Sequence, residues 1–166
     1  CESTDDGVTW RWLAEIPTRP GDNLGGYSEL HSVETTDGGI VAHIRNDNEA
    51  NRREILQSES DDGGRTFADP WPVEPPLEGP EWELCTPVTP LSDGRWLLIS
   101  STWMDWSGAL PNGHRMVAMV STDQGRSWPD YLTVMHDPDQ PVIFWESKIV
   151  EMPDGRLGAV AWVYAQ

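Results

Sequence analysis

The stretch SDDGGRTF at residues 60–67 decides the fold, because the chain of 166 residues repeats its pattern. Related stretches are STDDGVTW at residues 3–10 and STDQGRSW at residues 121–128. All three follow the pattern Ser-x-Asp-x-Gly-x-Thr/Ser-aromatic and stand at nearly equal spacing along the chain. Repetition at such a spacing indicates stacked copies of one supersecondary unit.

Each copy has the residues of a tight hairpin turn. Its Asp carboxylate can accept hydrogen bonds from backbone N–H groups of the same turn, and its Gly can adopt a positive φ. The aromatic residue that ends the copy is expected to bind the next strand to the hydrophobic core. We therefore predict structural roles for three carboxylates and buried positions for three aromatic residues: Asp5, Asp62, Asp123, Trp10, Phe67 and Trp128.

A second repeat lies upstream of each place where a turn is expected. It reads SELHSVETTDGGIVAHIR at residues 28–45, TPVTPLSDGRWLLISS at residues 86–101 and SKIVEMPDGRLGAVAW at residues 147–162. In each copy two apolar-alternating runs flank an Asp-Gly pair, which is a strong signal for a β-hairpin. Each copy therefore predicts two antiparallel strands.

Two further apolar runs complete the unit. Residues 54–58 and 116–120 precede a repeated turn, and residues 70–73 and 131–135 follow one. The unit is thus a four-stranded antiparallel meander, the blade of a β-propeller. No segment keeps an apolar period of 3.6 residues for three turns, so we expect an all-β chain.

The repeated turns resemble Asp boxes, also called bacterial neuraminidase repeats, which occur in sialidases and related β-propellers. The resemblance implies a sialidase-like β-propeller of four-stranded antiparallel blades, with about three blade-equivalents present of an expected six. We expect residues 1–26 to end one blade, 27–80 to form a second, 81–140 a third, and 141–166 to start a fourth. The chain would then be a partial propeller domain, about half of the ring.

A ring of this kind needs roughly 4–8 blades, so the partners expected first are the blades that close it. They could belong to a longer chain, or a second copy could complete the ring as a homodimer. We favour the longer chain, because only Cys1 and Glu2 precede the first repeated turn and leave most of one strand missing.

Composition excludes several other partners. The formal net charge is −17, from 28 acidic and 11 basic residues, which argues against nucleic acid and against an anionic membrane surface. Cys1 and Cys85 are the only cysteines, too few for a disulfide framework or a cysteine zinc site. We expect no metal and no cofactor. The sequence leaves the cellular location open, and the resemblance favours an extracellular or periplasmic one.

The order of strands in a meander predicts where a ligand site lies. The Asp-Gly hairpins and the repeated turns share one face of the ring, and the longer loops share the other, which is the expected place for function. The residues that begin or end strands at that face are the candidates. For catalysis they are Asp47 and Glu29, and for substrate binding they are Arg45, His31, Glu146, Trp103, Trp106 and Arg115.

Two pairs of candidate residues each allow two interpretations. Glu29 and Glu146 stand at the same distance before their Asp-Gly pairs, so each either contacts a ligand or accepts hydrogen bonds from a neighbouring blade. Trp103 and Trp106 either stack on sugar rings or pack on their own blade.

Arg45 and Asp47 are the pair that the resemblance addresses most directly. Sialidases carry an acid/base Asp on a loop soon after the first strand of a blade, and Asp47 comes at about that place. The Arg that opens that strand in sialidases is replaced here by Ser28. The alternative is that Arg45-Asn46-Asp47-Asn48 forms a solvated turn.

Two functions follow from these observations. The first is an exo-glycosidase-related hydrolase that acts on a glycan with carboxylate acid/base chemistry. The second is a propeller that binds a carbohydrate, a protein or another small-molecule ligand without catalysis, since one fold hosts unrelated functions.

Overall fold

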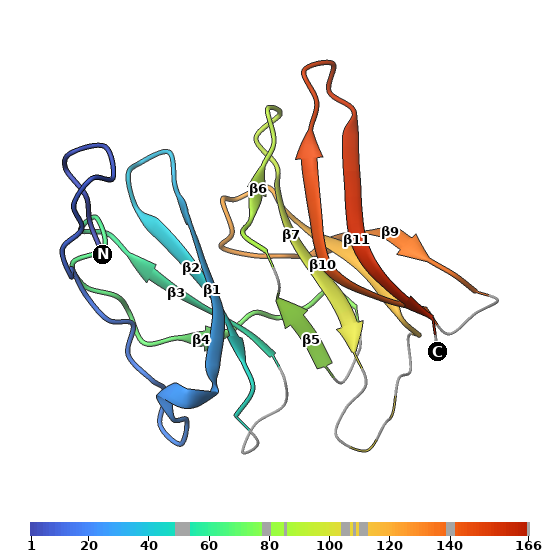
Figure 1. Cartoon of the computed structure of the whole chain (residues 1–166), viewed down its shortest axis with the longest axis horizontal. Coiled ribbons are helices and arrows are strands. Elements are labelled where there is room, and N and C mark those ends of the chain that lie inside the picture. Colours follow the sequence, from blue (N-terminus) through green and yellow to red (C-terminus); the bar gives the residue numbers. More distant parts are fainter. Residues whose placement is uncertain are drawn as a thin grey trace.

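The computed structural model describes residues 1–48, 54–77, 81–84, 86–103, 107, 109, 113–138 and 142–165. They form three antiparallel sheets that stand side by side (Figure 1). The first sheet contains β1 (Tyr27–Glu34), β2 (Ile40–Asn46), β3 (Glu54–Ser60) and β4 (Trp71–Pro72). The second contains β5 (Glu81–Leu84), β6 (Thr89–Pro90), β7 (Trp96–Trp103), β8 (Arg115–Ser121) and β9 (Asp130–His136). The third contains β10 (Val142–Glu151) and β11 (Leu157–Ala165).

The sheet order confirms the predicted meander. The first sheet runs β1-β2-β3-β4, and the second runs β5-β7-β8-β9 with the short β6 also paired to β7. The helical turn η1 (Leu24–Gly26) is the one helix in the described part of the chain, so the predicted all-β fold is confirmed. No helix there is long and apolar enough to cross a membrane. The division into blades at residues 26, 80 and 140 stays a prediction.

The three Asp boxes share one hydrogen-bond arrangement. The Ser hydroxyl of each box donates to the Asp Oδ1 and accepts from the Gly N–H, for example at 2.9 Å and 2.9 Å in the box of Asp62. That Oδ1 accepts from the backbone N of Thr66 at 2.9 Å, and Oδ2 accepts from its hydroxyl at 2.7 Å. The box glycines have φ of 83°, 81° and 84° at Gly7, Gly64 and Gly125.

These bonds make the box carboxylates structural, as predicted. The Thr66 hydroxyl and backbone N–H hold the pKa of Asp62 well below its usual range, and Thr9 lowers the pKa of Asp5 in the same way. For Asp123, burial would raise the pKa, but hydrogen bonds from Ser127 and Ser121 outweigh it and lower the value.

The three box aromatics are not equivalent, and the prediction of a buried position is wrong for Trp10. Trp128 is 5% exposed and joins the second sheet to the first. Its ring meets His43 edge-on at a centroid distance of 5.7 Å, and its Nε1 donates to Gln57 Oε1 at 3.5 Å. Phe67 is half-buried, whereas Trp10 is 67% exposed because no sheet of the described chain covers it.

The core has two layers between the sheets and a smaller third cluster, Tyr27, Ile44 and Leu56 with Ile16, on the outer side of the first sheet. The first layer joins the facing sides of the first and second sheets, with Val41, Ile55, Leu98 and Met119 at its centre. The second layer joins the second sheet to β10 and β11 through another set of buried side chains, among them Leu97, Ile99, Met116, Val142 and Phe144. Each inner sheet face is thus covered by a neighbouring sheet.

The outer face of the third sheet is open instead. Val150, Val160 and Trp162 on it are 59%, 66% and 71% exposed. At the opposite end of the row, Leu24 and Leu30 beside the first sheet are 56% and 52% exposed. Two apolar faces therefore lie at the two ends of the described structure.

Candidate functional site

The two ends of the sheets carry different kinds of connection. In Figure 1 the hairpins β1–β2, β6–β7 and β10–β11 reach the upper end, and β2 and β7 end at the lower one. We call the described lower end of the first sheet, formed by residues 19–28, 45–48 and 54, the rim. Arg45, Asp47 and Ser28 belong to this rim, opposite the hairpins, as the order of strands predicted.

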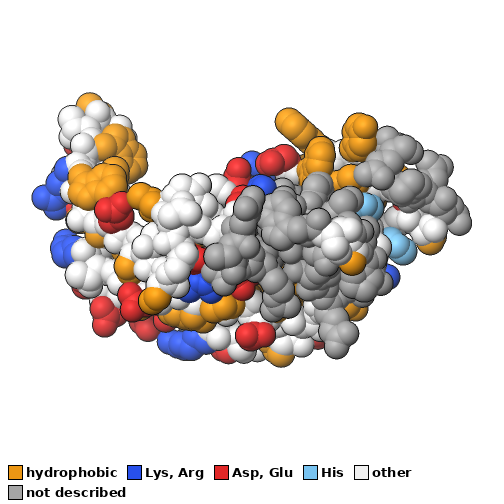
Figure 2. All heavy atoms as spheres, turned by 90° about the horizontal axis from the view of Figure 1, so that it is seen from below, with side chains coloured by type: hydrophobic (Ala, Val, Ile, Leu, Met, Phe, Trp, Pro, Cys, Tyr) orange, Lys and Arg blue, Asp and Glu red, His pale blue; other side chains and the backbone are white. Residues whose placement is uncertain are grey.

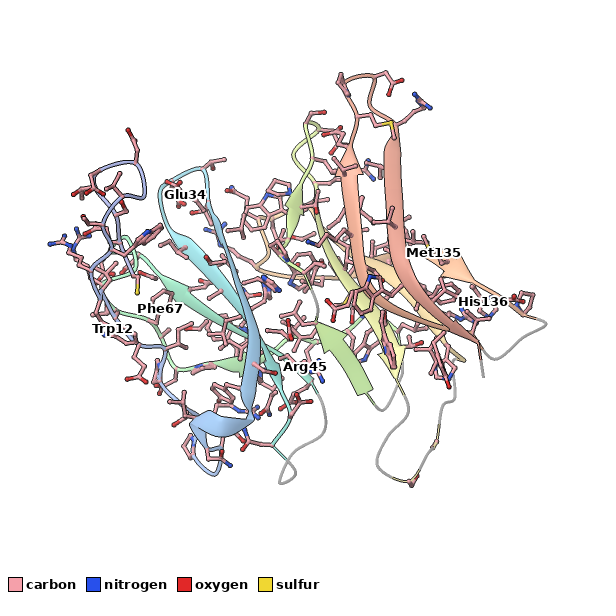
Figure 3. All side chains as sticks on the ribbon, viewed as in Figure 1. Trp12, Glu34, Arg45, Phe67, Met135 and His136 are labelled. Carbon is pink, nitrogen blue, oxygen red and sulfur yellow. The ribbon has the colours of Figure 1, made fainter. Side chains whose placement is uncertain are left out.

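The structure brings Arg45 and Asp47 together. Arg45 stands at the end of β2 opposite Ser28 of β1. Its Nε lies 2.9 Å from Asp47 Oδ2, and the Ser28 hydroxyl donates to the same oxygen at 3.3 Å. The two charged side chains are 25% and 29% exposed, so solvent or a ligand reaches both. Figure 3 shows Arg45 beside the lower half of β1.

The turn that carries Asp47 is solvated only in part, because its two asparagines are buried. Asn46 is fully buried and Asn48 is 4% exposed. Asn48 Nδ2 donates to Asn46 Oδ1 at 2.7 Å, and Asn48 Oδ1 accepts from Asn23 Nδ2 at 2.8 Å. Two buried amides therefore stand on either side of Asp47 in the sequence. Asparagine is typical of turns, so the sequence predicted a turn here, but no sequence pattern indicated that these two side chains are buried.

A second polar group lies next to this turn and was also missed. Arg19 Nε pairs with Asp22 Oδ2 at 2.9 Å, and Arg19 Nη2 pairs with Glu54 Oε1 at 2.6 Å. The Tyr27 hydroxyl donates to the same Asp22 oxygen at 3.0 Å. Burial is the main cause that raises the pKa of Tyr27, so this hydroxyl stays protonated at neutral pH and acts as a donor.

Glu29 and Glu146 occupy equivalent places, as predicted. Each lies at a bulge in the first strand of its sheet, where the pairing shifts between Ser28 and His31 or between Trp145 and Lys148. Their φ values are 48° and 46°, in the left-handed region that side chains disfavour. Both side chains are exposed. A ligand or a neighbouring blade can therefore reach either carboxylate.

The strands also place His31 and Arg115. His31 pairs with His43 of β2, two residues before Arg45. His31 lines an apolar hollow of about 450 Å³ between residues 12–16 and the first sheet, together with Trp12, Leu13 and Leu30. Trp12 and Phe67 mark this side of the molecule in Figure 3. Arg115 opens β8 in the second sheet, where its backbone N donates to Thr102 Oγ1 at 2.9 Å.

The two tryptophan candidates can be placed only in part. Trp103 ends β7, and its side chain and the whole of Trp106 lie outside the described residues. Figure 2 views the lower end of Figure 1 and shows acidic and basic side chains mixed on the described surface, with apolar side chains at two raised corners and a hollow between them. The described residues hold no group of three His, Cys, Asp or Glu that could bind a metal ion.

Comparisons with known proteins agree with this architecture. Residues 2–159 match the family described as BNR repeat-like domain. None of the curated proteins matches the sequence significantly. Among solved structures, a protein of unknown function from Dyadobacter fermentans is 20% identical with a TM-score of 0.66, over 84% of this chain and 44% of that one.

Two sialidase structures show the same fold. A mutant of the NanB sialidase from Streptococcus pneumoniae is 21% identical with a TM-score of 0.61, over 96% of this chain and 23% of that one. The intramolecular trans-sialidase from Ruminococcus gnavus is 20% identical with a TM-score of 0.57, over 96% of this chain and 32% of that one. The chain thus has the sialidase-like β-propeller fold and spans less than half of each of these proteins.

Proposed function

This chain belongs to the BNR repeat-like domain family, and on that premise we propose that its rim is part of a glycan-hydrolysing site. The observation that supports the proposal most directly is the contact of Arg45 and Ser28 with Asp47 Oδ2, at 2.9 Å and 3.3 Å. A carboxylate that is oriented by two donors and still open to solvent meets the first requirement of acid/base catalysis, a fixed position.

The roles follow from the chemistry of each group. Asp47 exchanges the proton with the glycosidic oxygen or with the attacking water, which glycosidases assign to a carboxyl group. Arg45 orients Asp47 and a hydroxyl or acidic group of the sugar. Glu29, exposed at its bulge on the neighbouring strand, supplies a second carboxylate toward the ligand.

The charge of the chain bears on the substrate. A net charge of −17 repels anionic glycans unless the site itself is basic. Arg45 is the described cation at the Asp47 site, and Arg19 is already paired with Asp22 and Glu54. We therefore keep the substrate class at glycans in general, neutral or acidic, and let the test separate the two.

The test is hydrolysis of a panel of aryl glycosides that includes neutral sugars and a sialoside. Asp47→Asn should lose about 100-fold or more of the turnover, because acid/base catalysis contributes about 10²–10⁴-fold. Asp61→Asn is the matched control, since Asp61 is an exposed carboxylate on the box side of the same sheet. Equal activity of Asp47→Asn and the wild type would contradict the proposal, as would a folded wild type without turnover.

A second candidate function is glycan binding without catalysis. The rim supports it too, because Glu29 is exposed at its bulge and Arg45 is 25% exposed, so both can contact a sugar without any proton transfer. Binding on a glycan array that is lost in Glu29→Ala, without turnover of any glycoside, would favour this function over hydrolysis.

The partners that we propose are sheets of the same kind. The inner sheet faces are covered by neighbouring sheets. Residues 12–16 cover the outer face of the first sheet only in part, so Leu30 stays exposed, as Val160 does on the third sheet. Further blades of a longer chain, or a second copy, would cover them. Light scattering of the purified chain distinguishes these partners. A stable monomer of 18.6 kDa contradicts both, and a dimer supports the second copy. A longer chain that is monomeric and more stable supports the first.

A further inference from the structure

We propose that Asn48 is a positioning residue that holds Asp47 in place against Arg45, an inference that rests on the proposed function of Asp47. Asn48 Oδ1 accepts hydrogen bonds from the backbone N of Asn23 at 3.0 Å and from its Nδ2 at 2.8 Å. Asn48 Nδ2 donates to Asn23 O at 3.2 Å and to Asn46 Oδ1 at 2.7 Å. One side chain thus joins the segment before β1 to the turn after β2.

The contacts require an amide at this position. The side chain must accept on one atom and donate on the other, which Asn and Gln can do and an ionised Asp cannot. Asn48 is 4% exposed, so water cannot readily replace the lost bonds. Removing the amide would leave the Asn23 donors and the buried Asn46 oxygen with fewer partners, at a cost in free energy.

The backbone contacts around Asp47 show which part of the rim the Asn48 amide positions. Asp47 N donates to Gly26 O at 2.7 Å, so the residue between the two buried amides is tied to η1. A Cβ atom on Gly26 would overlap the side-chain amide of Asn48. The close approach of these two residues therefore sets how far the Asp47 turn lies from β1, and with it the distance between Asp47 and Arg45.

The contact between Gly26 and Asn48 can be disrupted by a substitution at either residue. Asn48→Ala removes the amide and leaves Gly26 unchanged. Gly26→Ala keeps the amide and displaces it by steric overlap, and its φ is not in the left-handed region, so Ala adds no backbone strain there. In the double variant the methyl group of Ala has room. We therefore expect the two substitutions to be non-additive, with the double variant no worse than Asn48→Ala.

The experiment follows the Arg45 Nε–H group by ¹⁵N NMR in the wild type and in these variants. The bond to Asp47 should protect this proton from exchange, and Asn48→Ala and Gly26→Ala should each speed its exchange by about ten-fold or more. Turnover of the best glycoside should fall by about 10–100-fold, mainly in kcat, because a small misplacement of a catalytic group has effects of this size.

Ser60→Ala is the control, because it removes a buried hydrogen-bonding group from a box and should lower the melting temperature without changing the Arg45 signal. An unchanged Arg45 signal in folded Asn48→Ala and Gly26→Ala would overturn the positioning role. A wild type that hydrolyses no glycoside would contradict the proposed function alone, and the Arg45 signal would then still support or overturn the positioning of Asp47.

Discussion

The box side and the rim of the first sheet both have polar turns at strand ends, but their hydrogen bonds join residues at different sequence separations. The box bonds join residues two to four positions apart, as between Ser60, Asp62 and Thr66. The rim bonds join residues 19 positions apart for Ser28 and Asp47, and 25 for Asn23 and Asn48. A box is therefore complete within its own turn, whereas the rim exists only once the sheet has formed.

This difference distinguishes the boxes, which serve the fold, from the rim, which is a candidate site for chemistry. The same box geometry recurs at three places because the same local residues recur, and a repeated feature serves the repeated fold. The rim has no copy among the described residues, and its exposed carboxylate is oriented by groups from different strands. Such an arrangement is typical of sites that act on ligands. Four tests of this comparison follow, in order of decreasing effect.

Trp128→Ala should have the largest effect on stability. Its ring is 5% exposed and packs against His43 of the neighbouring sheet, so its loss should lower the free energy of unfolding by about 3–5 kcal/mol. Trp10→Ala, at the same box position but 67% exposed, should change it by less than about 0.5 kcal/mol. Chemical denaturation measures both, and equal effects would show that box position rather than sheet contact sets the stability.

Acidification should have the next largest effect, through His43. Burial lowers the pKa of His43 to about 4, although the hydrogen bond with Gln57 acts in the opposite direction. The unfolded chain binds the proton first, so stability is complete above pH 6.5 and falls as the pH drops from 6.5 to 4. The loss should reach about 3 kcal/mol, and His43→Gln should remove most of it in urea titrations at both pH values. The same pH dependence in both proteins would contradict the prediction.

Asp123→Ala and Asp47→Asn compare a box carboxylate with a rim carboxylate. Asp123 accepts from the Ser127 hydroxyl at 2.6 Å and from its backbone N at 2.9 Å, so its loss should cost about 1–2 kcal/mol of stability. Asp47 makes a partly exposed ion pair, which is worth about 0–1 kcal/mol. Asp47→Asn should therefore unfold nearly as the wild type does, and a larger loss than in Asp123→Ala would make Asp47 a structural residue.

Glu146→Gly should have the smallest effect and the opposite sign. Its φ of 46° lies in the left-handed region, which Gly adopts without steric cost, so the substitution should stabilise the chain by about 1 kcal/mol or less. Glu29→Gly should behave alike in thermal unfolding, because its φ is 48°. If Glu29 contacts the ligand, only Glu29→Gly of this pair should also weaken turnover or binding. Destabilisation by both would show that the side chains, not the bulges, matter.

The sequence predicted the strands better than the contacts between sheets. The Asp-Gly pairs and boxes placed the turns, and most strands lie where the apolar runs predicted them. The strand β5 was not predicted, and the run before Asp93 forms a strand only at Thr89–Pro90. Burial of the box aromatics was predicted alike for three residues, but it depends on the neighbouring sheet and fails at Trp10. Arg45 and Asp47 were candidates because of their places at the end of a strand, but neither their ion pair nor the role of Ser28 as a second donor was predicted.

The sequence by itself determined the repeating unit, its turns and the face on which a site should lie. These features depend on hydrogen bonds and apolar periods within a few residues, which a short window of sequence contains. Only the tertiary structure decided that Asn46 and Asn48 are buried, that Gly26 must leave room for an amide, and that Trp128 and His43 meet. Those contacts form when distant strands pair and sheets stack, so the free energy that selects them depends on neighbours that no local pattern names.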